Sequence, residues 1–233
     1  MRGVTTERAV TLLNDTILQL EDIHKSFGGT QVLNGISLTA RQGEFITLLG
    51  SSGCGKTTTL RIIAGLESPD SGRVLLEGRD MTRAEPNKRD VNTVFQNYAL
   101  FPHMNVEQNI GYSLKIRRAA KEEIRRRVGE MLQLVQLEGY EKRMPGELSG
   151  GQKAKLFFLK MILDGCNVLV LDEPTRNFSP LSGPVIRGIL EDFPGCIISV
   201  SHDRKYIGQV CSTLYRLEPS GLAPMENLWR ERP

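Results

Sequence analysis

The chain alternates between short apolar runs and segments that have one apolar and one polar face. In residues 17–27 and 31–40, apolar and polar positions alternate, which predicts strands with one buried face, and the glycine pair at 28–29 predicts a turn between them. Residues 44–50 and 167–172 are continuous apolar runs, which are typical of strands buried on both faces. The pattern therefore predicts an N-terminal hairpin followed by strands of a covered sheet.

Further strands and helices are predicted along the rest of the chain. We expect strands after the turn SPDSG and at residues 91–96, 196–201 and 213–217, and helices at residues 56–66, 122–137, 153–163, 185–193 and 203–211. Between about residues 98 and 165 the pattern is helical throughout. This order favours an α/β fold with a mainly parallel, covered sheet and a helical insertion in the middle.

The expected organisation is one folded domain with short extensions. It spans residues 17–222 and includes a helical subdomain at about 97–165, with an N-terminal extension at 1–16 and a C-terminal tail at 223–233. Apolar residues make up 39% and charged residues 24%, which is ordinary for a soluble domain. The net charge of +3 does not by itself indicate nucleic acid, and the basic run at 115–127 has interleaved acids that favour a solvated helix face.

Cysteine spacing and hydropathy bear on the compartment. The four cysteines, at positions 54, 166, 196 and 211, have no metal-ligand spacing and are interpreted as reduced thiols, which favours the cytoplasm. No run approaches the roughly 20 apolar residues of a membrane-spanning helix. The N-terminus also lacks the apolar core of a secretory signal. If a membrane is involved, a partner is expected to provide the span.

The clearest chemical motif is GSSGCGKTT at residues 50–58. It matches the pattern GxxxxGK[ST] and lies between a predicted strand and a predicted helix, which is the context that this pattern requires. Glycines allow backbone N–H groups to surround phosphate oxygens, and the helix N-terminus adds partial positive charge. Lys56 can reach the outer phosphates and Thr57 can ligate Mg²⁺. The residues expected to bind the nucleotide here are Gly50, Ser51, Ser52, Gly53, Cys54, Gly55, Lys56, Thr57 and Thr58.

Other candidate residues are weaker when taken alone. Asp172 and Glu173 end a predicted strand; beside a phosphate loop they suit Mg²⁺ binding and water activation, although two acids can also simply face solvent. A lone histidine after a strand, such as His202, is more often structural than catalytic, and Gln96 is unremarkable by itself. The turn LSGGQ (148–152) can cap the next helix or bind an anion.

Taken together and in order, these motifs resemble the nucleotide-binding domain of ABC-type ATPases. The sequences GSSGCGKTTTLRIIAGL, Gln96, LSGGQ, LDEPT and SHD carry the resemblance, which covers about residues 17–218. It implies a P-loop NTPase fold, with an ABC-type ATPase core, a β subdomain and a helical insertion. It also implies ATP hydrolysis with ATP and Mg²⁺ as ligands.

The resemblance assigns roles residue by residue. Phe27 would stack on the adenine, and Thr57, Gln96 and Asp172 would hold Mg²⁺. The catalytic residues would be Gln96, Glu173 as general base, and His202 at the γ-phosphate and attacking water. In the signature that ends at Gln152, the residues Ser149, Gly150 and Gly151 would clasp the γ-phosphate of ATP held by the opposite subunit. The family therefore implies a head-to-tail pair of two such domains.

The part of the chain up to about residue 147 is similar to ATPase subunits of bacterial spermidine/putrescine importers. The segments KSFGGTQVLNG and NYALFPHMNVEQNI carry this similarity. It implies a subunit that hydrolyses ATP to power polyamine uptake through a separate membrane permease. We expect coupling through about residues 97–117, a peripheral position at the inner face of the cell membrane, and no direct contact with nucleic acid.

The part from about residue 148 resembles ABC-F ATPases, which act on ribosomes. LSGGQKAKLFFLKMIL, LDEPTRNFSP and SHDRKYI carry that similarity, and Ser179 stands where importers have a turn aspartate that links the two sites of the dimer. A chimera joined near residues 145–150, or an intermediate branch of the superfamily, would explain both likenesses. A ribosome-associated ATPase and an uncoupled nucleotide-binding module are therefore the alternative functions.

Overall fold

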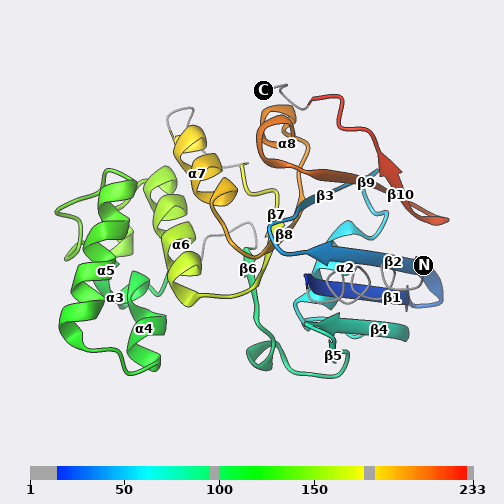
Figure 1. Ribbon diagram of the computed structural model, residues 1–233, viewed down its shortest axis with the longest axis horizontal. Helices are drawn as coiled ribbons and strands as arrows, with labels where there is room; N and C mark the ends of the chain where they lie inside the picture. The colour runs from blue at the N-terminus through cyan, green and yellow to red at the C-terminus, as the bar shows by residue number, and fades with distance from the viewer. Residues whose placement is uncertain (1–14, 95–99, 176–181, 230–233) are drawn as a thin grey trace, which may run out of the picture. The chain divides into compact units, whose positions relative to one another are not determined.

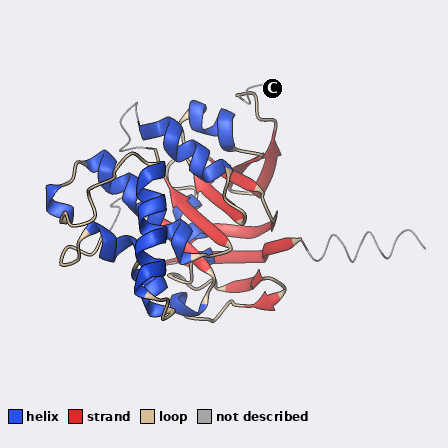
Figure 2. Cartoon of the chain, turned by 60° about the vertical axis from the view of Figure 1, so that its left-hand side comes forward, coloured by secondary structure: helices blue, strands red, loops and turns tan. Residues whose placement is uncertain are grey.

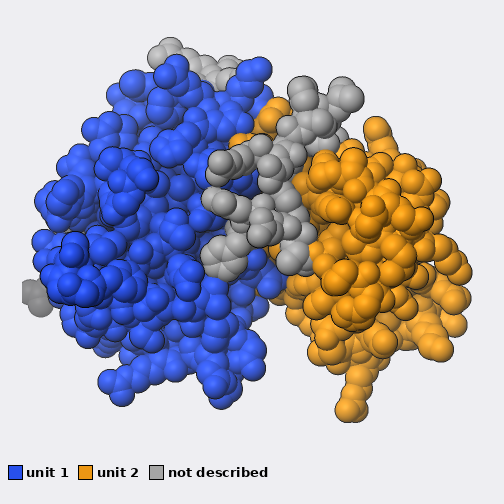
Figure 3. All heavy atoms as spheres, turned by 180° about the vertical axis from the view of Figure 1, so that it is seen from behind, with its two compact units in different colours: residues 1–94, 167–174, 193–233 blue, residues 95–166, 175–192 orange. Residues whose placement is uncertain are grey.

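The computed structural model describes residues 15–94, 100–175 and 182–229, and the chain divides into two compact units. Unit 1 comprises residues 1–94, 167–174 and 193–233, and unit 2 comprises residues 95–166 and 175–192 (Figure 3). All strands of the described residues belong to unit 1. Figure 2 draws these strands in red and the helices in blue. The chain thus passes twice from the unit that contains the sheets into the helical unit and back.

Unit 1 contains a four-stranded antiparallel sheet with the order β2-β1-β4-β5 (Figure 1). Its strands are β1 (Thr16–Phe27), β2 (Thr30–Arg41), β4 (Ser71–Leu76) and β5 (Arg79–Asp80). The predicted hairpin is confirmed, since β1 pairs with β2 and Phe27 lies opposite Thr30. The apolar positions of β1 that alternate in the sequence are buried, because they form one wall of the core of this unit.

The second sheet of unit 1 has six strands in the order β10-β9-β3-β8-β7-β6. They are β3 (Phe45–Leu49), β6 (Val91–Val94), β7 (Val168–Asp172), β8 (Cys196–Val200), β9 (Thr213–Glu218) and β10 (Gly221–Met225). All pairs are parallel except β9 with β10. Every residue of β7 and β8 is buried, as expected for continuous apolar runs. β10 extends past residue 222, where the sequence suggested a tail.

Two helices of unit 1 are connected to the parallel strands of the second sheet. Helix α2 (Lys56–Ile63) follows β3 and packs against β7 and β8, and α8 (Arg204–Val210) joins β8 to β9. A short 3₁₀ helix, η1 (Pro86–Lys88), precedes β6. Helix α2 begins at Lys56 as predicted but ends three residues earlier than its pattern suggested. The chain turns at Gly65, whose φ of +75° is the left-handed conformation in which helices commonly end.

Unit 2 is helical in its described residues. Its elements are α3 (Val106–Ile110), α4 (Tyr112–Ile116), α5 (Lys121–Leu134), η2 (Pro145–Glu147), α6 (Gly150–Asp164) and α7 (Ser182–Glu191). Helix α6 packs against α3, α4, α5 and α7. Val128, Leu132 and Val135, in the segment predicted as a helix at residues 122–137, are buried in the core of this unit. No helix of the described chain is both long enough and apolar enough to cross a membrane.

The topology of the parallel sheet brings three chain segments to one edge. Strands β3, β8 and β7 are neighbours and run parallel, so their carboxyl ends lie at the same edge. In open α/β sheets this edge is where ligands bind. The residues that follow these strands are Gly50, Glu173 and Ser201, which places the glycine-rich loop, the acids and His202 together.

Candidate nucleotide-binding site

The loop between β3 and α2 has a course that requires glycine at two positions. A Cβ on Gly50 (φ +154°) would lie 2.6 Å from Cys54 Sγ and 2.7 Å from the Leu217 carbonyl oxygen. A Cβ on Gly55 (φ +100°) would lie 2.5 Å from Leu33 Cδ2. A side chain at either position would therefore displace the loop, which must stay tightly wound for its N–H groups to converge.

Lys56, the first residue of α2, places its ammonium group inside this loop. Its Nζ atom donates to the carbonyl oxygens of Gly50 and Ser51, both at 2.8 Å, and lies 3.7 Å from Cys54 Sγ. The side chain is buried in the fold. A fixed positive charge at the start of a helix is the arrangement that binds the outer phosphates of a nucleotide.

Thr57 and Asp172 supply oxygen atoms beside the loop. The Thr57 hydroxyl donates to Asp172 Oδ2 at 3.3 Å, and Asp172 is buried at the end of β7. Hydroxyl and carboxylate oxygens are the hard ligands that Mg²⁺ prefers, and Mg²⁺ is usually held by one or two carboxylates together with substrate phosphates. The donor set therefore fits Mg²⁺. The described residues contain no group of three or more histidines, cysteines or acids that would form an all-protein metal site.

Glu173 has an unusual backbone conformation that directs its side chain. Its φ of +50° lies in the left-handed region, which is uncommon for residues other than glycine. The Glu173 N–H donates to the Val200 carbonyl oxygen at 2.9 Å, which fixes this turn against β8. Glu173 Oε1 lies 3.8 Å from His202 Nε2. The turn thus brings a carboxylate and an imidazole to the same side of the sheet edge.

Asp203, to which sequence reasoning assigned no role, caps the helix that follows His202. Asp203 Oδ1 accepts hydrogen bonds from the N–H groups of Lys205 and Tyr206 and so caps α8. The Asp203 N–H in turn donates to Ser201 Oγ at 3.1 Å. An aspartate directly before an amphipathic helix is a recognisable N-cap signal. The backbone at His202 is therefore held between the end of β8 and a capped helix.

A pocket of about 440 Å³ collects these groups in unit 1. It is lined by the loop residues Gly50, Ser51, Ser52, Gly53, Gly55, Lys56, Thr57 and Thr58, together with Val32, Asp172, Glu173, Val200 and His202. Cys54 points behind the loop toward Gly50 and does not line this pocket. The described candidate residues of unit 1, apart from Cys54 and Phe27, thus share one cavity.

Phe27 lies outside that pocket, at the end of β1, with 47% of its surface exposed. Lys25 Nζ lies 5.0 Å from the centre of its ring and forms ion pairs with Glu67 at 2.8 Å and Asp70 at 3.4 Å. The hydrogen bond to Glu67 is the main cause that raises the pKa of Lys25 above its ordinary value. The aromatic ring of Phe27 is therefore exposed to solvent and lies next to the ammonium group of Lys25.

A family model described as "ABC transporter" matches residues 33–176, which is more than half of the chain. The chain belongs to the ABC transporter family. The spermidine/putrescine import ATP-binding protein PotA of Acidothermus cellulolyticus is 52% identical over 161 residues, covering 67% of this chain and 42% of that protein. The protein of the same name from Spiroplasma citri is 51% identical over 197 residues, covering 83% of this chain and 56% of that protein. This chain thus spans about half the length of these curated relatives.

Solved structures of ABC transporter subunits have the same fold. CbiO1 from Clostridium perfringens, part of the ABC transporter complex cbiONQ, matches with a TM-score of 0.78 and 26% identity over 90% of this chain and 87% of that chain. A structure of an ATP-binding subunit of an ABC transporter matches with a TM-score of 0.79 and 21% identity over 90% of each chain. The ABC transporter chain therefore has an α/β P-loop NTPase fold.

The ABC transporter signature LSGGQ begins helix α6 in unit 2. Ser149 Oγ accepts from the Gln152 N–H at 3.3 Å, while Gln152 Oε1 accepts from the Ser149 N–H at 2.9 Å. This reciprocal pair is a capping box, so one of the two roles suggested by the sequence, helix capping, is confirmed. Gly150 and Gly151 form the first turn of the helix, which is why it starts three residues before the segment that its apolar pattern indicated.

Two expectations from the sequence lie outside the described residues. They concern Gln96, expected at the metal and in catalysis, and Ser179, expected to weaken communication between sites. The segment expected to couple to a permease, residues 97–117, is described only from residue 100. These three remain predictions.

Sequence reasoning also missed Arg89, which braces the far end of α2 in the ABC transporter fold. Its guanidinium donates to four main-chain carbonyl oxygens, those of Ile62 at 2.8 Å, Ile63 at 3.0 Å, Ala84 at 3.1 Å and Thr82 at 3.2 Å. Burial lowers the pKa of Arg89. The sequence offered no local signal for this role, because the two α2 carbonyls are 26 and 27 residues away.

Proposed function

We propose that this chain is the ATP-binding and ATP-hydrolysing subunit of an ABC importer and that it powers solute uptake through a separate permease. The observation that supports this most directly is the pocket of unit 1, in which the phosphate loop, Asp172, Glu173 and His202 line one cavity. This combination provides a phosphate site, a metal ligand and a candidate base at one edge of the sheet.

Binding of ATP rests on the loop and on Lys56. Backbone N–H groups of residues 50–58 surround the phosphates, and the Lys56 ammonium supports the charge of the β- and γ-phosphates. Thr57 and Asp172 would hold Mg²⁺, which neutralises charge that develops on the phosphate oxygens. Gln96 would complete the metal ligands. Phe27 would stack on the adenine, which its exposed ring at the end of β1 allows.

Hydrolysis uses Glu173 and His202. Glu173 accepts a proton from the attacking water, and its left-handed turn places the carboxylate at the edge of the pocket. The imidazole of His202, 3.8 Å from that carboxylate, donates toward the γ-phosphate oxygens or the water. Because no covalent intermediate is needed, positioning and charge account for the chemistry.

A complete site requires a second copy of the chain. Ser149, Gly150 and Gly151 of the signature clasp the γ-phosphate bound by the opposite subunit, so that two copies pair head to tail around two ATP molecules. In support, the Ser149–Gln152 capping box keeps the signature at the first turn of a helix, where Ser149 and Gly150 are exposed. ATP closes the pair, and hydrolysis opens it.

Polyamine uptake is the transport function that we propose. It rests on the names of relatives about 50% identical to this chain, which are spermidine/putrescine import ATP-binding proteins. Coupling to permease subunits would run through residues 97–117 at the inner face of the membrane, where α3 and α4 present helical surface. A ribosome-associated role and an uncoupled module remain the alternatives.

The test is the steady-state ATPase rate per subunit as a function of protein concentration. We expect a rate that rises with concentration and vanishes in Glu173→Gln, because composite sites form only in the pair. A rate equal to that of Glu173→Gln at every concentration would leave binding without turnover and favour the uncoupled module. Co-sedimentation of Glu173→Gln with ribosomes in the presence of ATP would instead favour the ribosomal alternative.

A further inference from the structure

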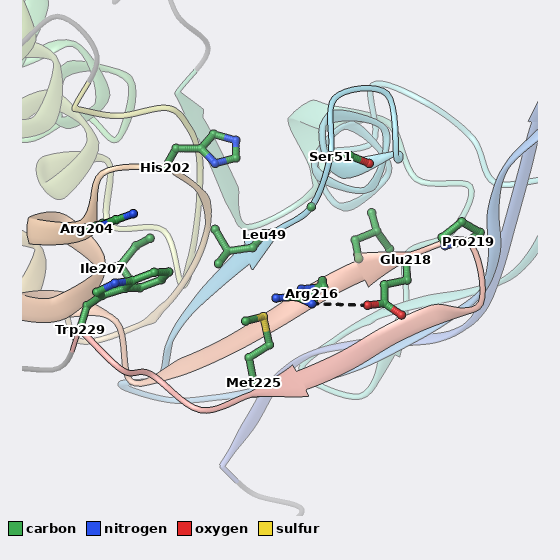
Figure 4. Close-up of a pocket in the computed structure, with 12 residues that line it drawn as sticks. Leu49, Ser51, His202, Arg204, Ile207, Arg216, Glu218, Pro219, Met225 and Trp229 are labelled. Carbon is green, nitrogen blue, oxygen red and sulfur yellow. Dashed lines mark ion pairs between the residues drawn. The ribbon is translucent and has the colours of Figure 1, made fainter.

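A second pocket lies directly behind the phosphate loop in unit 1. It has a volume of about 570 Å³ and is formed by the end of β3, the helix α8, strands β9 and β10, and the segment that follows β10 (Figure 4). Its wall combines the apolar side chains of Leu49, Ile207, Met225 and Trp229 with the cationic side chains of Arg204 and Arg216. Neither the phosphate chemistry nor the signature accounts for this combination.

The Trp229 side of this pocket is built by specific packing. Asn227 Nδ2 donates to the carbonyl oxygens of Ile207 and Cys211, both at 3.2 Å, and Asn227 Oδ1 accepts from the Trp229 N–H at 3.2 Å. A Cβ on Gly208 would lie only 2.1 Å from the Trp229 carbonyl oxygen, so the segment rests directly on the backbone of α8. The backbone of Trp229 is therefore held against α8, and its side chain lines the pocket.

The charges in the pocket favour an anion. Figure 4 shows that Arg204 projects from α8 and Arg216 from β9. The guanidinium carbon of Arg204 lies 5.8 Å from the centre of the Trp229 ring, and Arg216 Nη1 lies 3.9 Å from Glu218 Oε1, which is longer than a hydrogen bond. The lining thus contains two guanidinium groups and one carboxylate, and this excess of donors suits the carboxylate, sulfonate or phosphate group of a ligand. The indole and the aliphatic side chains suit a flat apolar body.

The second pocket, which we call the pocket of Trp229, shares part of its lining with the phosphate-loop pocket. Gly50, Ser51 and His202 line both the phosphate-loop pocket and the pocket of Trp229. A molecule in the second pocket therefore touches the same loop and the same histidine that the nucleotide site uses. Any preference of that molecule for one arrangement of these residues changes ATP affinity, and by reciprocity ATP changes its affinity.

We propose that the pocket of Trp229 binds a small amphipathic anion, with a flat apolar body and one acidic group, and that its occupancy alters nucleotide binding through Gly50, Ser51 and His202. The acidic group is held between Arg204 and Arg216, and the apolar body lies against Trp229 and Met225. The binding part of this proposal is independent of the function proposed above, whereas the coupling part rests on it.

Binding is tested with anilinonaphthalene sulfonate, a fluorescent aromatic sulfonate. Trp229 is the single tryptophan of the chain, so energy transfer from tryptophan to the probe reports probe bound near Trp229, and the two arginine variants separate this pocket from the adjoining nucleotide pocket. We expect saturable transfer whose dissociation constant rises about tenfold in Arg204→Gln and in Arg216→Gln, as expected for loss of one charged hydrogen bond. Arg79→Gln, an exposed arginine on β5, is the matched control and should bind as the wild type does.

The proposed binding site would be refuted if energy transfer from Trp229 to the probe were absent, or equally strong in both pocket variants and the control. Coupling is tested by equilibrium dialysis of ATP with and without saturating probe, and we expect the ATP dissociation constant to change by about fivefold or more. Bound probe with unchanged ATP affinity would overturn the coupling. A chain that binds the probe but no ATP would refute the proposed function and leave the new site standing.

Discussion

Arg89→Met removes a buried guanidinium together with the hydrogen bonds that it donates to four carbonyl oxygens, of which that of Ile62 also accepts from the Gly65 N–H. The methionine fills similar volume, so the main change is the loss of hydrogen bonds at the end of α2. A hydrogen bond from a charged donor contributes about 1.5–3 kcal/mol, but such terms are not additive. Relief of the unfavourable burial of the charge offsets part of the loss.

We therefore expect Arg89→Met to lower the free energy of unfolding by about 3 kcal/mol, within the range for breaking a buried polar network. For a domain of this size, each kcal/mol shifts the melting temperature by roughly 2–4 °C, so the expected fall is roughly 6–12 °C. Because α2 begins at Lys56, loosening its other end should also weaken ATP binding.

The measurement is urea unfolding followed by the fluorescence of Trp229, which belongs to the same unit as Arg89. Arg79→Met, which alters an exposed arginine, is the control and should stay within about 0.5 kcal/mol of the wild type. Arg89→Lys should be intermediate, since an ammonium cannot reach four separated acceptors. An unfolding free energy for Arg89→Met equal to that of the control would refute the bracing role.

Three further predictions concern single side chains. N-ethylmaleimide should block ATP binding by adding bulk at Cys54, whose Sγ lies 3.7 Å from Lys56 Nζ, and ATP should protect; continued binding after complete labelling would contradict this. Ser149→Ala should speed hydrogen exchange in the first turn of α6, because about 1 kcal/mol of capping is lost, whereas Ser149→Asn should not. Equal exchange rates in Ser149→Ala and the wild type would argue against the cap. The pKa of Lys25 is raised from 10.5, so its stabilising effect is complete below pH 10.5 and is lost as the pH rises through the higher folded-state pKa. Unfolding free energy should therefore fall more steeply in that alkaline range in the wild type than in Lys25→Met, and parallel curves would disprove it.

Most strands and the long helices could be predicted because their hydrophobic patterns are local. The alternation in β1 and β2 and the uniform burial of β7 and β8 follow directly from the sequence. Helices α3 and α4 have only five residues each, too few for periodicity to show, although the Asn105–Gln108 capping box marks the start of α3. Strand β10 contains Pro224 and lies at a sheet edge, so its sequence does not resemble a strand.

The site could be predicted as a set of residues but not as a geometry. The motif identifies Lys56 and Thr57, and the order β3-β8-β7, which places the acids and His202 beside them, depends on strand pairing far apart in the chain. The left-handed turn at Glu173 follows from its fit against Val200 and has no sequence signature. The bracing by Arg89 and the pocket of Trp229 likewise arise from long-range packing.

Lys56 is hydrogen-bonded to its own loop, and an anion that binds the lysine must replace these bonds. The Lys56 ammonium has three protons, and two of them point at the carbonyl oxygens of Gly50 and Ser51. An anion therefore exchanges existing bonds for new ones, so a single weakly held phosphate gains little from the lysine. A polyphosphate gains more because it also engages several backbone N–H groups at once. Under the proposed function, the loop would therefore favour longer phosphate chains, because a ligand must compete with the hydrogen bonds that Lys56 already makes within the loop.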